Sequence, residues 1–254
     1  MSIILEAEHL TKVFTTKGKE VLKAVDDVSF QLETGEILGI VGESGSGKST
    51  LAKLITRLTD LTSGTLIFDG KDITNLTGRE LKHFYGKIQM VFQNPLTSFD
   101  PRRTLGDGIG ESLRNRGMKK EERNRRITEV LEQAGLSSEF ADRYPHEVSG
   151  GQCQRAAIAR ALAVEPAILI CDEATSALDV TIQKQIMDLL QELKEKQGLS
   201  FIFICHNLAL VQMFCDRVLV LYDGKVAESG TTDEIINHPK EEYTKKLIES
   251  ACES

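Results

Sequence analysis

Residues 37–58 carry the pattern that most constrains the fold: an apolar run, a glycine-rich stretch and a helical pattern, in the order ILGIV, GESGSGK and STLAKLITRL. Residues 42–50 match the spacing G-x-x-x-x-G-K-[ST] of a phosphate-binding loop, which functions between a strand and a helix. The glycines let the backbone approach a phosphate closely, while Lys48 adds a positive charge at the β and γ oxygens and Ser49 a hydroxyl for Mg²⁺. A glycine-rich turn at an ordinary helix start would not need this whole set. The predicted nucleotide contacts are Gly42, Glu43, Ser44, Gly45, Ser46, Gly47, Lys48, Ser49 and Thr50.

Four further apolar runs favour a sheet that is buried on both faces. They are short, rich in β-branched or aromatic residues and bounded by glycine, proline or charge, which is typical of parallel strands between helices. They lie at 88–92, 167–171, 201–205 and 218–222, and helical patterns lie at 48–58, 120–135, 152–163 and 180–196. Segment 3–33 alternates and has hairpin signals at 16–20, which predicts a small antiparallel sheet beside the main one.

The segment from about 95 to 150 is rich in charge and has no convincing strand, so we expect a helical insertion. The chain has 254 residues, of which 41% are hydrophobic, enough to bury a full core. We predict an α/β fold with a mostly parallel sheet, forming one domain over residues 1–254. About 1–94 and 160–254 would form the core with its antiparallel part, and about 95–159 the helical subdomain.

The net charge and the spacing of the cysteines argue against two kinds of function, nucleic-acid binding and metal binding by thiols. A formal net charge of −7 argues against a nucleic-acid-binding surface, although a local basic groove stays open. No eighteen apolar residues run together, so we expect a soluble cytoplasmic chain. The cysteines at 153, 171, 205, 215 and 252 are far apart and form no C-x-x-C pair, which favours buried free thiols over metal ligands.

Two acidic residues, Asp172 and Glu173, follow the apolar run at 167–171. Ligands of open α/β sheets bind where the strands end, so both carboxylates are candidates for the nucleotide site. A nucleotide hydrolase needs an acid that organises Mg²⁺ and a base that activates water, and we assign Asp172 to the first role and Glu173 to the second. A solvated turn or a helix N-cap is the alternative interpretation.

Two more polar residues follow apolar runs. His206 comes after FIFIC, where its imidazole could reach the γ-phosphate or the attacking water, and Gln93 comes after IQMVF, where its amide oxygen could reach Mg²⁺ or the water. A lone histidine is more often structural, and Gln93 could simply make a turn contact before Pro95. Their predicted place at the same edge as Asp172 favours the catalytic interpretation.

The stretch VSGGQCQRAA at 148–157 puts a serine and two glycines before a helical pattern. A helix start with free N–H groups binds anions, but this one lacks the lysine and the Mg²⁺ ligands of a complete nucleotide site. It is therefore better suited to close over a nucleotide that is bound elsewhere. The simpler interpretation is a plain N-cap by Ser149.

Taken in order, these motifs resemble those of the ATP-binding subunits of ABC transporters over nearly the whole chain. The matching features are Phe14 as an adenine-stacking ring, loop 42–50, Gln93, VSGGQ at 148–152, Asp172 with Glu173, SALD at 176–179, and His206. The resemblance implies a P-loop NTPase (RecA-like) core, ATP and Mg²⁺ as cofactors, and ATP hydrolysis. Phe14, Val148 and Ala174 replace the family's commoner tyrosine, leucine and proline, and only the first change loses a polar group, the tyrosine hydroxyl.

In this family two nucleotide-binding domains pack head to tail, and the signature of one closes on the ATP of the other. The resemblance therefore implies that Ser149, Gly150 and Gly151 serve the ATP of a partner. Gln152 and Asp179 join the predicted nucleotide contacts on the same ground.

Three stretches are most similar to the ATPases of the peptide and nickel import group: MVFQNPLTSFDPRRTL, DRYPHEVSGGQCQRAAIARAL and INHPKEEYTKKLIES. This similarity implies an importer of di- or oligopeptides, or of nickel or metal chelates, with the chain peripheral at the cytoplasmic face of the membrane. Two transmembrane permeases, an extracytoplasmic solute-binding protein and a second, different ATPase subunit are the expected partners, with a homodimer as the other option. The alternative is a soluble ABC ATPase acting on nucleic acid or ribosomes, but the long coiled-coil or basic insertions of that class are not in the sequence, and we expect no nucleic-acid partner.

Segment 94–115 links Gln93 to the helical part, which faces the membrane subunits in the family. Its apolar residues Leu96, Phe99 and Leu105 form either a permease-docking groove or ordinary core, and the sequence leaves both open.

Overall fold

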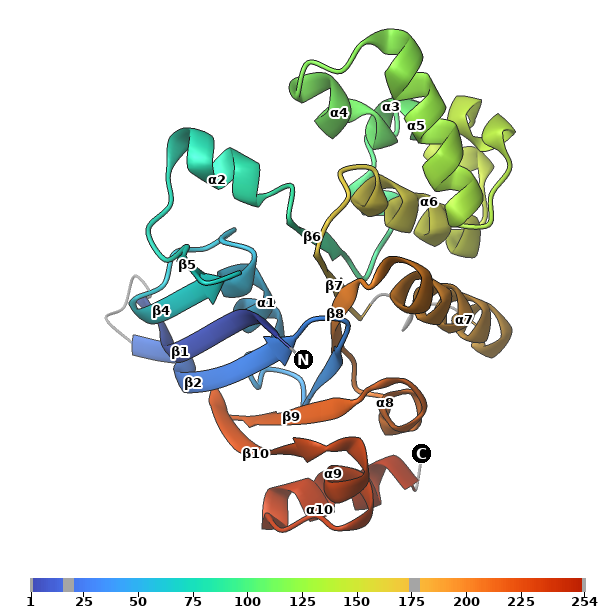
Figure 1. The fold of residues 1–254 in the computed structure, drawn as a ribbon. Helices are drawn as coiled ribbons and strands as arrows, with labels where there is room; N and C mark the ends of the chain where they lie inside the picture. The colour runs from blue at the N-terminus through green and yellow to red at the C-terminus, as the bar shows by residue number, and fades with distance from the viewer. Residues whose placement is uncertain (1, 16–20, 174–178, 253–254) are drawn as a thin grey trace. The chain divides into compact units, whose positions relative to one another are not determined.

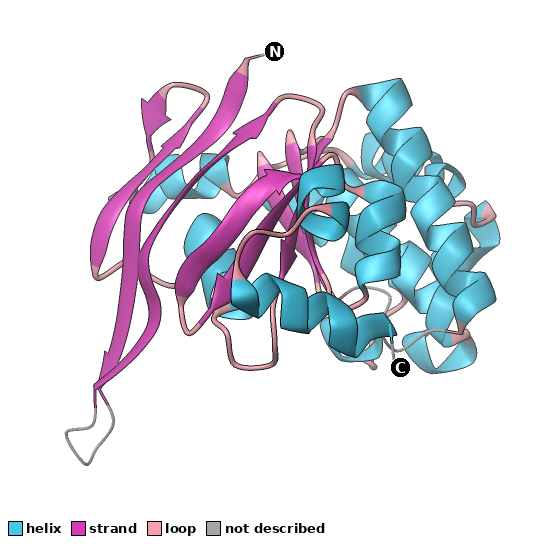
Figure 2. Ribbon diagram, turned by 90° about the horizontal axis from the view of Figure 1, so that it is seen from below, coloured by secondary structure: helices cyan, strands magenta, loops and turns pink. Residues whose placement is uncertain are grey.

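The computed structural model describes residues 2–15, 21–173 and 179–252, and its contacts group the chain into two compact units, residues 1–85 with 198–254 and residues 86–197. Figures 1 and 2 show the elements of both units. The predicted subdomain boundaries near 95 and 159 stay a prediction.

The first unit begins with an antiparallel sheet in the order β2-β1-β4-β5. Its strands are β1 (Ile3–Thr15), β2 (Val21–Glu33), β4 (Ser63–Phe68) and β5 (Lys71–Asp72). The β1–β2 hairpin predicted from segment 3–33 is confirmed, while its turn at 16–20 lies outside the described residues. The sequence did not reveal β4, because only Leu66 of its six residues is buried.

The second sheet of this unit contains β3 (Ile37–Val41), β8 (Ser200–Ile204), β9 (Arg217–Tyr222) and β10 (Lys225–Thr231). β3 lies parallel to both β8 and β9, and β10 closes a hairpin with β9. All residues of β3 and β8 are buried, as expected for strands that are covered on both faces. The strand predictions for 37–41, 201–205 and 218–222 are confirmed to within one residue.

The described residues of the first unit also form the helices α1 (Lys48–Ile55), α2 (Gly78–Phe84), α8 (Leu208–Phe214), α9 (Thr232–Asn237) and α10 (Glu242–Cys252). α1 ends three residues before the predicted position 58. The cause is Arg57, whose φ of 56° is left-handed and cannot continue an α-helix.

In the second unit, β6 (Ile88–Val91) pairs in parallel with β7 (Ile168–Asp172). Its helices are α3 (Leu105–Ile109), α4 (Glu111–Asn115), α5 (Lys120–Gln133), α6 (Gly150–Leu162) and α7 (Val180–Gln197), with short 3₁₀ turns η1 (Leu96–Ser98), η2 (Ser138–Asp142) and η3 (Pro145–Glu147). Residues 92–167 are all described and contain helices and turns but no strand, which confirms the helical character expected of this segment.

The structure resolves the two options for segment 94–115 within this unit. Phe99 is 4% exposed and Leu105 is fully buried, so both belong to the core, whereas Leu96 is 47% exposed. Only Leu96 of the three keeps an accessible side chain for docking.

Cys153, Cys171, Cys205 and Cys215 are buried free thiols, as predicted. Burial, opposed by the nearby charge of Arg160, raises the pKa of Cys153 to about 11. In the described part of the chain, no helix has the length and apolar composition needed to cross a bilayer.

Candidate active site

The phosphate loop leaves β3 and enters α1 through backbone that only glycine can adopt. Gly42 has a φ of 150°, and a Cβ built on it would lie 2.2 Å from the carbonyl oxygen of Leu221. Gly47 has a φ of 102°, and its Cβ would lie 2.2 Å from the carbonyl oxygen of Ala24. The two glycines are therefore required by close backbone neighbours on β9 and β2 as well as by their own dihedral angles.

Lys48 is buried at the start of α1, and its ammonium group is held by the loop itself. Nζ donates to the carbonyl oxygens of Gly42 at 2.8 Å and Glu43 at 2.7 Å, and to the Ser46 hydroxyl at 3.4 Å. The positive charge is thus fixed inside the turn of the loop, where it can attract phosphate oxygens. Ser49 is exposed in the first turn of α1.

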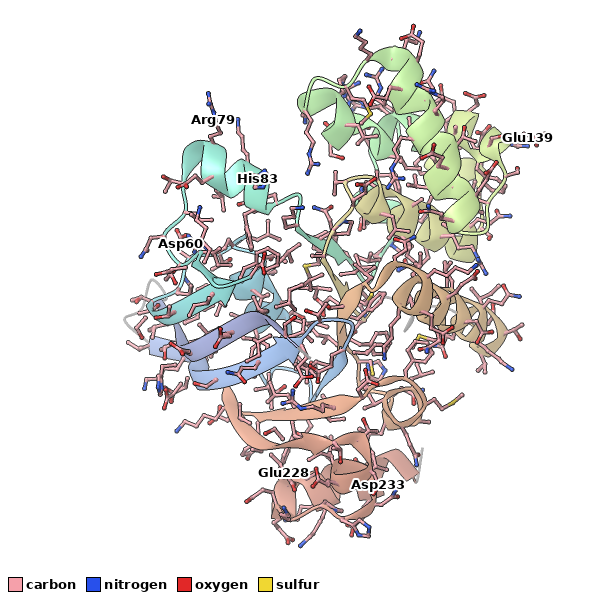
Figure 3. The ribbon with its side chains drawn as sticks, viewed as in Figure 1. Asp60, Arg79, His83, Glu139, Glu228 and Asp233 are labelled. Atoms are coloured by element: carbon pink, nitrogen blue, oxygen red, sulfur yellow. The ribbon has the colours of Figure 1, made fainter. Side chains whose placement is uncertain are left out.

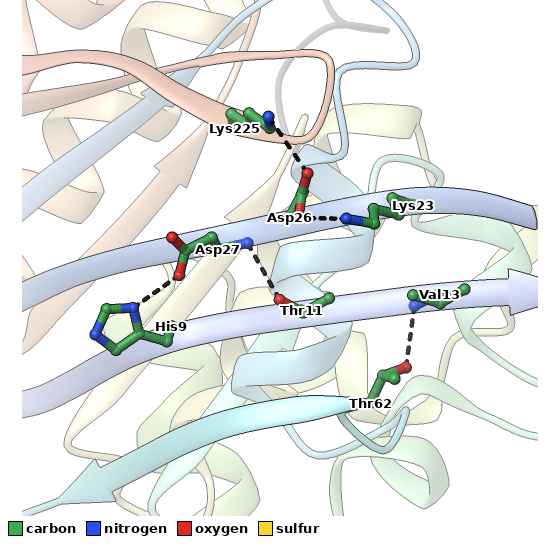
Figure 4. A network of polar contacts seen from close by, with 8 residues as sticks. All are labelled: His9, Thr11, Val13, Lys23, Asp26, Asp27, Thr62 and Lys225. Carbon is green, nitrogen blue, oxygen red and sulfur yellow. Dashed lines mark hydrogen bonds and ion pairs between the residues drawn. The ribbon is translucent and has the colours of Figure 1, made fainter.

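The loop is also braced from outside, through the turn between β9 and β10. Gly224 N–H donates to the carbonyl of Ser46 at 3.1 Å, and Asp26 N–H donates to the carbonyl of Gly224 at 2.8 Å. The Asp26 carboxylate pairs with Lys23 and Lys225, as Figure 4 shows, and the hydrogen bond from Lys23 is the main cause that lowers the pKa of Asp26.

This contact of the β9–β10 turn with the loop was not predicted from the sequence. The signal was present as the dipeptide Asp223-Gly224, since both residues have positive φ and form the kind of tight hairpin turn that Asp-Gly favours.

Phe14, the predicted adenine-stacking residue, lies on β1 with its ring 41% exposed. The ammonium group of Lys12 lies 5.2 Å from the ring centroid. Phe14 pairs with Leu22 on β2, two residues before Ala24, the residue that contacts Gly47. The same strand therefore passes both the exposed ring and the phosphate loop, about 7 Å apart along the strand.

His206 is placed beside the phosphate loop by strand register. Ile40 of β3 pairs with Ile204 of β8, and two residues further along these parallel strands come Gly42 and His206. The imidazole is exposed and follows the last strand residue by two positions. The chain thus brings His206 and the loop to one edge of this sheet.

In the second unit, β6 and β7 bring Gln93 and Glu173 together in the same way. Val91 pairs with Cys171, and two residues past this pair the Gln93 amide nitrogen donates to the Glu173 carboxylate at 2.7 Å. The hydrogen bond fixes the orientation of the carboxylate, and a carboxylate oxygen is a proton acceptor.

Glu173 also has an unusual backbone, with a φ of 49° in the left-handed region. That conformation costs a non-glycine residue about 1–3 kcal/mol, and such strain collects at functional sites. Asp172, the last residue of β7, is half-buried. Burial, with a smaller contribution from the Asp172 charge, raises the pKa of Cys171 to about 12, so this thiol stays protonated beside the two carboxylates.

The signature stretch begins α6 with a capping box. The Ser149 hydroxyl accepts from Gln152 N–H at 3.3 Å, and the Gln152 side chain accepts from Ser149 N–H at 2.9 Å. Ser149 is therefore the N-cap of α6, as the simpler interpretation expected. This role does not exclude contact with a phosphate, because Ser149 and Gly150 are both exposed.

Gly151 differs from its neighbour because it is buried. A Cβ at this position would lie 2.7 Å from Cγ2 of Ile182 on α7. The second signature glycine is thus required by helix packing within this unit.

Asp179 caps α7, since its carboxylate accepts from Ile182 N–H at 3.0 Å. The preceding residues of the predicted SALD loop, 176–178, and Ala174 lie outside the described residues.

The predicted site residues fall into two groups that the structure describes separately. The phosphate loop, Phe14 and His206 belong to the first unit, whereas Gln93, Asp172, Glu173, the signature and Asp179 belong to the second. Each group combines features of a nucleotide-hydrolysing site: an anion-binding loop with its lysine in one, and an oriented carboxylate in the other.

Comparison with known proteins decides the family. Residues 25–176 match the family model described as ABC transporter. The oligopeptide transport ATP-binding protein OppF of Bacillus subtilis is 46% identical over 248 residues, which span 96% of this chain and 81% of the relative. The dipeptide transport ATP-binding protein DppF of Lactococcus lactis is 42% identical over 251 residues, 97% of this chain and 80% of the relative.

The chain belongs to the ABC transporter family.

A solved structure agrees with this assignment. The dimeric, post-hydrolysis ATP-binding cassette MJ0796, bound to ADP and Pi, is 34% identical and superposes with a TM-score of 0.82, covering 90% of this chain and 99% of the other. The predicted α/β P-loop NTPase fold and the resemblance to ABC ATP-binding subunits are confirmed. As an ABC transporter ATP-binding domain, the chain binds ATP and is an ATPase.

Proposed function

We propose that this chain is the ATP-hydrolysing subunit of an importer for oligopeptides or dipeptides. The observation that carries the proposal is the 46% identity along 96% of the chain to a protein named for oligopeptide transport. The relatives reported above are named for peptides, which favours peptides over nickel or metal chelates and does not favour an ABC ATPase acting on nucleic acid or ribosomes. The chain would act peripherally at the cytoplasmic face of the membrane, with two permeases and an extracytoplasmic solute-binding protein.

ATP would bind with its phosphates in the loop 42–50 and its adenine against Phe14. The buried ammonium of Lys48 is already directed into the loop by two carbonyl oxygens, so little reorganisation is needed when phosphate oxygens arrive. The exposed ring of Phe14 offers an aromatic face, which stacks with a base without sequence-specific hydrogen bonds.

Mg²⁺ fits the donor set that we assign to it, because the Ser49 hydroxyl, the Asp172 carboxylate and the Gln93 amide oxygen are all hard oxygen ligands. When bound, the ion would neutralise charge on the β and γ phosphates. The Gln93 amide nitrogen donates to Glu173, and we assign the amide oxygen of Gln93 to the ion.

Glu173 would act as the general base that takes a proton from the attacking water. Its support is the 2.7 Å hydrogen bond from Gln93, which orients the carboxylate, and the strained backbone at residue 173. His206, exposed two residues beyond β8, would contact the γ-phosphate or the same water.

Ser149 and Gly150 would close on the nucleotide of a partner domain, assisted by Gly151, Gln152 and Asp179. Two exposed signature residues at a helix start support this role. We propose a second, different ATPase chain as that partner, with a homodimer as the other outcome of the test below.

The catalytic role is tested with Glu173→Gln, assayed with the partner subunits. Turnover should fall by about 10²–10⁴ while ATP stays bound, because the general base is lost and the phosphate loop is unchanged. Glu132→Gln on the exposed side of α5 is the matched control and should keep full activity. Near-normal hydrolysis by Glu173→Gln would show that Glu173 is not the general base.

The partner is tested by mixing two inactive variants, Lys48→Ala and Ser149→Arg. In a mixed homodimer both defects fall into one composite site and leave the other intact, so hydrolysis should return if the chain pairs with itself. If it needs a different ATPase, mixing restores nothing and the wild-type chain hydrolyses ATP only with that subunit, which is the result we expect. No rescue with the proper partner, when one intact composite site remains, would count against action in trans.

Import is tested by reconstituting the chain with its permeases in vesicles and supplying the solute-binding protein outside. ATP-dependent uptake of a labelled oligopeptide is the expected result. Uptake of nickel but not of peptide would show that the proposed substrate class is wrong. ATP hydrolysis that is stimulated by RNA but by neither solute would show that the chain is not an importer subunit.

A further inference from the structure

The C-terminal helix α10 makes a direct hydrogen bond to the phosphate loop. The Tyr243 hydroxyl accepts from the backbone N–H of Glu43 at 3.1 Å. The two residues are 200 positions apart in the sequence, and Tyr243 lies in the closing stretch INHPKEEYTKKLIES, to which the proposed function gives no role.

The hydrogen bond to Tyr243 gives the backbone N–H of Glu43 an acceptor. Its carbonyl oxygen already accepts from the Lys48 ammonium at 2.7 Å and from Ser46 N–H at 3.2 Å. With Tyr243 on its N–H, residue 43 is held at both ends of its backbone. This is the part of the loop before α1, where helical hydrogen bonds do not reach.

A second aromatic ring holds the tyrosine in place. The rings of Tyr243 and Tyr222 lie with centroids 4.2 Å apart and planes tilted by 38°. Tyr222 is the last residue of β9, next to Leu221, whose carbonyl oxygen lies against Gly42 of the loop. The phenol is thus fixed by the same strand end that shapes the start of the loop.

The entry into α10 is fixed in turn by Glu228 on β10, which is labelled in Figure 3. Its carboxylate accepts from the backbone N–H groups of Lys240 at 2.9 Å and Glu241 at 3.2 Å. Burial raises the pKa of Glu228, but the two N–H donors and the charge of Lys240 lower it by more than burial raises it, so the carboxylate stays charged. Thr244, the neighbour of Tyr243, is fully buried.

We propose that Tyr243 is a positioning residue of the ATP site, which holds the phosphate loop in its nucleotide-binding conformation through the backbone of Glu43. A loop ordered before ATP arrives binds more tightly, because less conformational entropy is lost on binding. The inference rests on the ATP site of the chain and is independent of the transported substrate, so failure of peptide uptake would leave it intact.

The test is Tyr243→Phe, which removes the hydroxyl and keeps the ring against Tyr222. MgATP affinity of the full chain, measured by calorimetry, should weaken about three- to tenfold, the usual loss for one neutral hydrogen bond. In the assembled transporter the KM for ATP should rise by a similar factor with kcat little changed. Tyr222→Phe is the matched control, since the Tyr222 hydroxyl makes no hydrogen bond to the described residues, and it should bind ATP as the wild type does.

Amide hydrogen exchange gives a second, direct measurement. In Tyr243→Phe the amide of Glu43 should exchange faster, while the amides of α1 keep their protection. Unchanged ATP affinity and unchanged exchange at Glu43 would overturn the proposal. A loss of thermal stability in Tyr243→Phe with wild-type ATP affinity would also overturn it, because the helix would then serve the fold alone.

Discussion

Replacing Phe99 by alanine should destabilise the chain strongly, because the ring is a core element of the second unit. The side chain is 4% exposed, and the guanidinium carbon of Arg160 lies 4.6 Å from its centroid. On another side Gly108 comes so close that a Cβ there would lie 2.6 Å from the ring. Arg160 also donates to the carbonyl of Ser98, so ring, cation and backbone form one packed group.

The magnitude follows from two losses. Removing a buried phenyl ring usually costs about 3–5 kcal/mol, including the cavity that remains. The cation–π contact adds about 1 kcal/mol, since Arg160 is itself half-buried, and this burial lowers the pKa of its guanidinium. The total loss of about 4–6 kcal/mol is a large part of the roughly 5–15 kcal/mol that stabilises a typical protein.

The assay is urea unfolding of the purified chain, followed by circular dichroism. With a slope of about 2–3 kcal/mol per molar, the midpoint for Phe99→Ala should fall by about 2 M. Leu96→Ala is the control, because that side chain is 47% exposed and its loss should change stability by at most about 0.5 kcal/mol. A wild-type midpoint for Phe99→Ala, combined with lost permease binding, would refute the core assignment and restore the docking one.

Three further predictions concern the loop, the signature and the C-terminal helix. Gly42→Ala should abolish ATP binding, because its Cβ would lie 2.2 Å from a carbonyl oxygen of β9. Gly45→Ala should only weaken binding, because a Cβ there has open space around it. Calorimetry of ATP binding to the two variants measures the difference. Gly151→Ala should cost about 1–3 kcal/mol by overpacking, and adding Ile182→Ala should recover most of it in urea unfolding. Because the folded-state pKa of Glu228 is lowered, its stabilisation is present above the ordinary carboxyl pKa of about 4.3 and is lost as pH falls through the lower folded value. The thermal midpoint of Glu228→Gln should therefore fall less than that of the wild type between about pH 5 and pH 3.

Much of the fold could be predicted from sequence because its signals are local. The all-buried strands β3 and β8 are continuous apolar runs, and the helices α5 and α6 follow their own periodicity. β4 was missed because a half-exposed six-residue strand has no distinctive pattern, and α1 was overextended because no local rule forecasts the left-handed Arg57.

The candidate site also has features that local sequence predicts and features that depend on packing between distant segments. Spacing within a few residues was enough to predict the phosphate loop, the two carboxylates at the end of β7 and the signature, since each motif lies within one short segment. Whether Phe99 faces a partner or the core depended on Arg160, a residue sixty-one positions later.

The amino-acid sequence by itself determined which residue types are available to bind and hydrolyse a nucleotide, and the short-range geometry of the loop that carries Lys48. Only the tertiary structure decided that Gln93 orients Glu173, that Gly151 is a packing residue, and that Tyr243 holds Glu43. The physical reason is that these contacts join residues from 31 to 200 positions apart. Such pairs meet only when strands and helices pack, and no pattern within one segment encodes the distance between two side chains that belong to different segments.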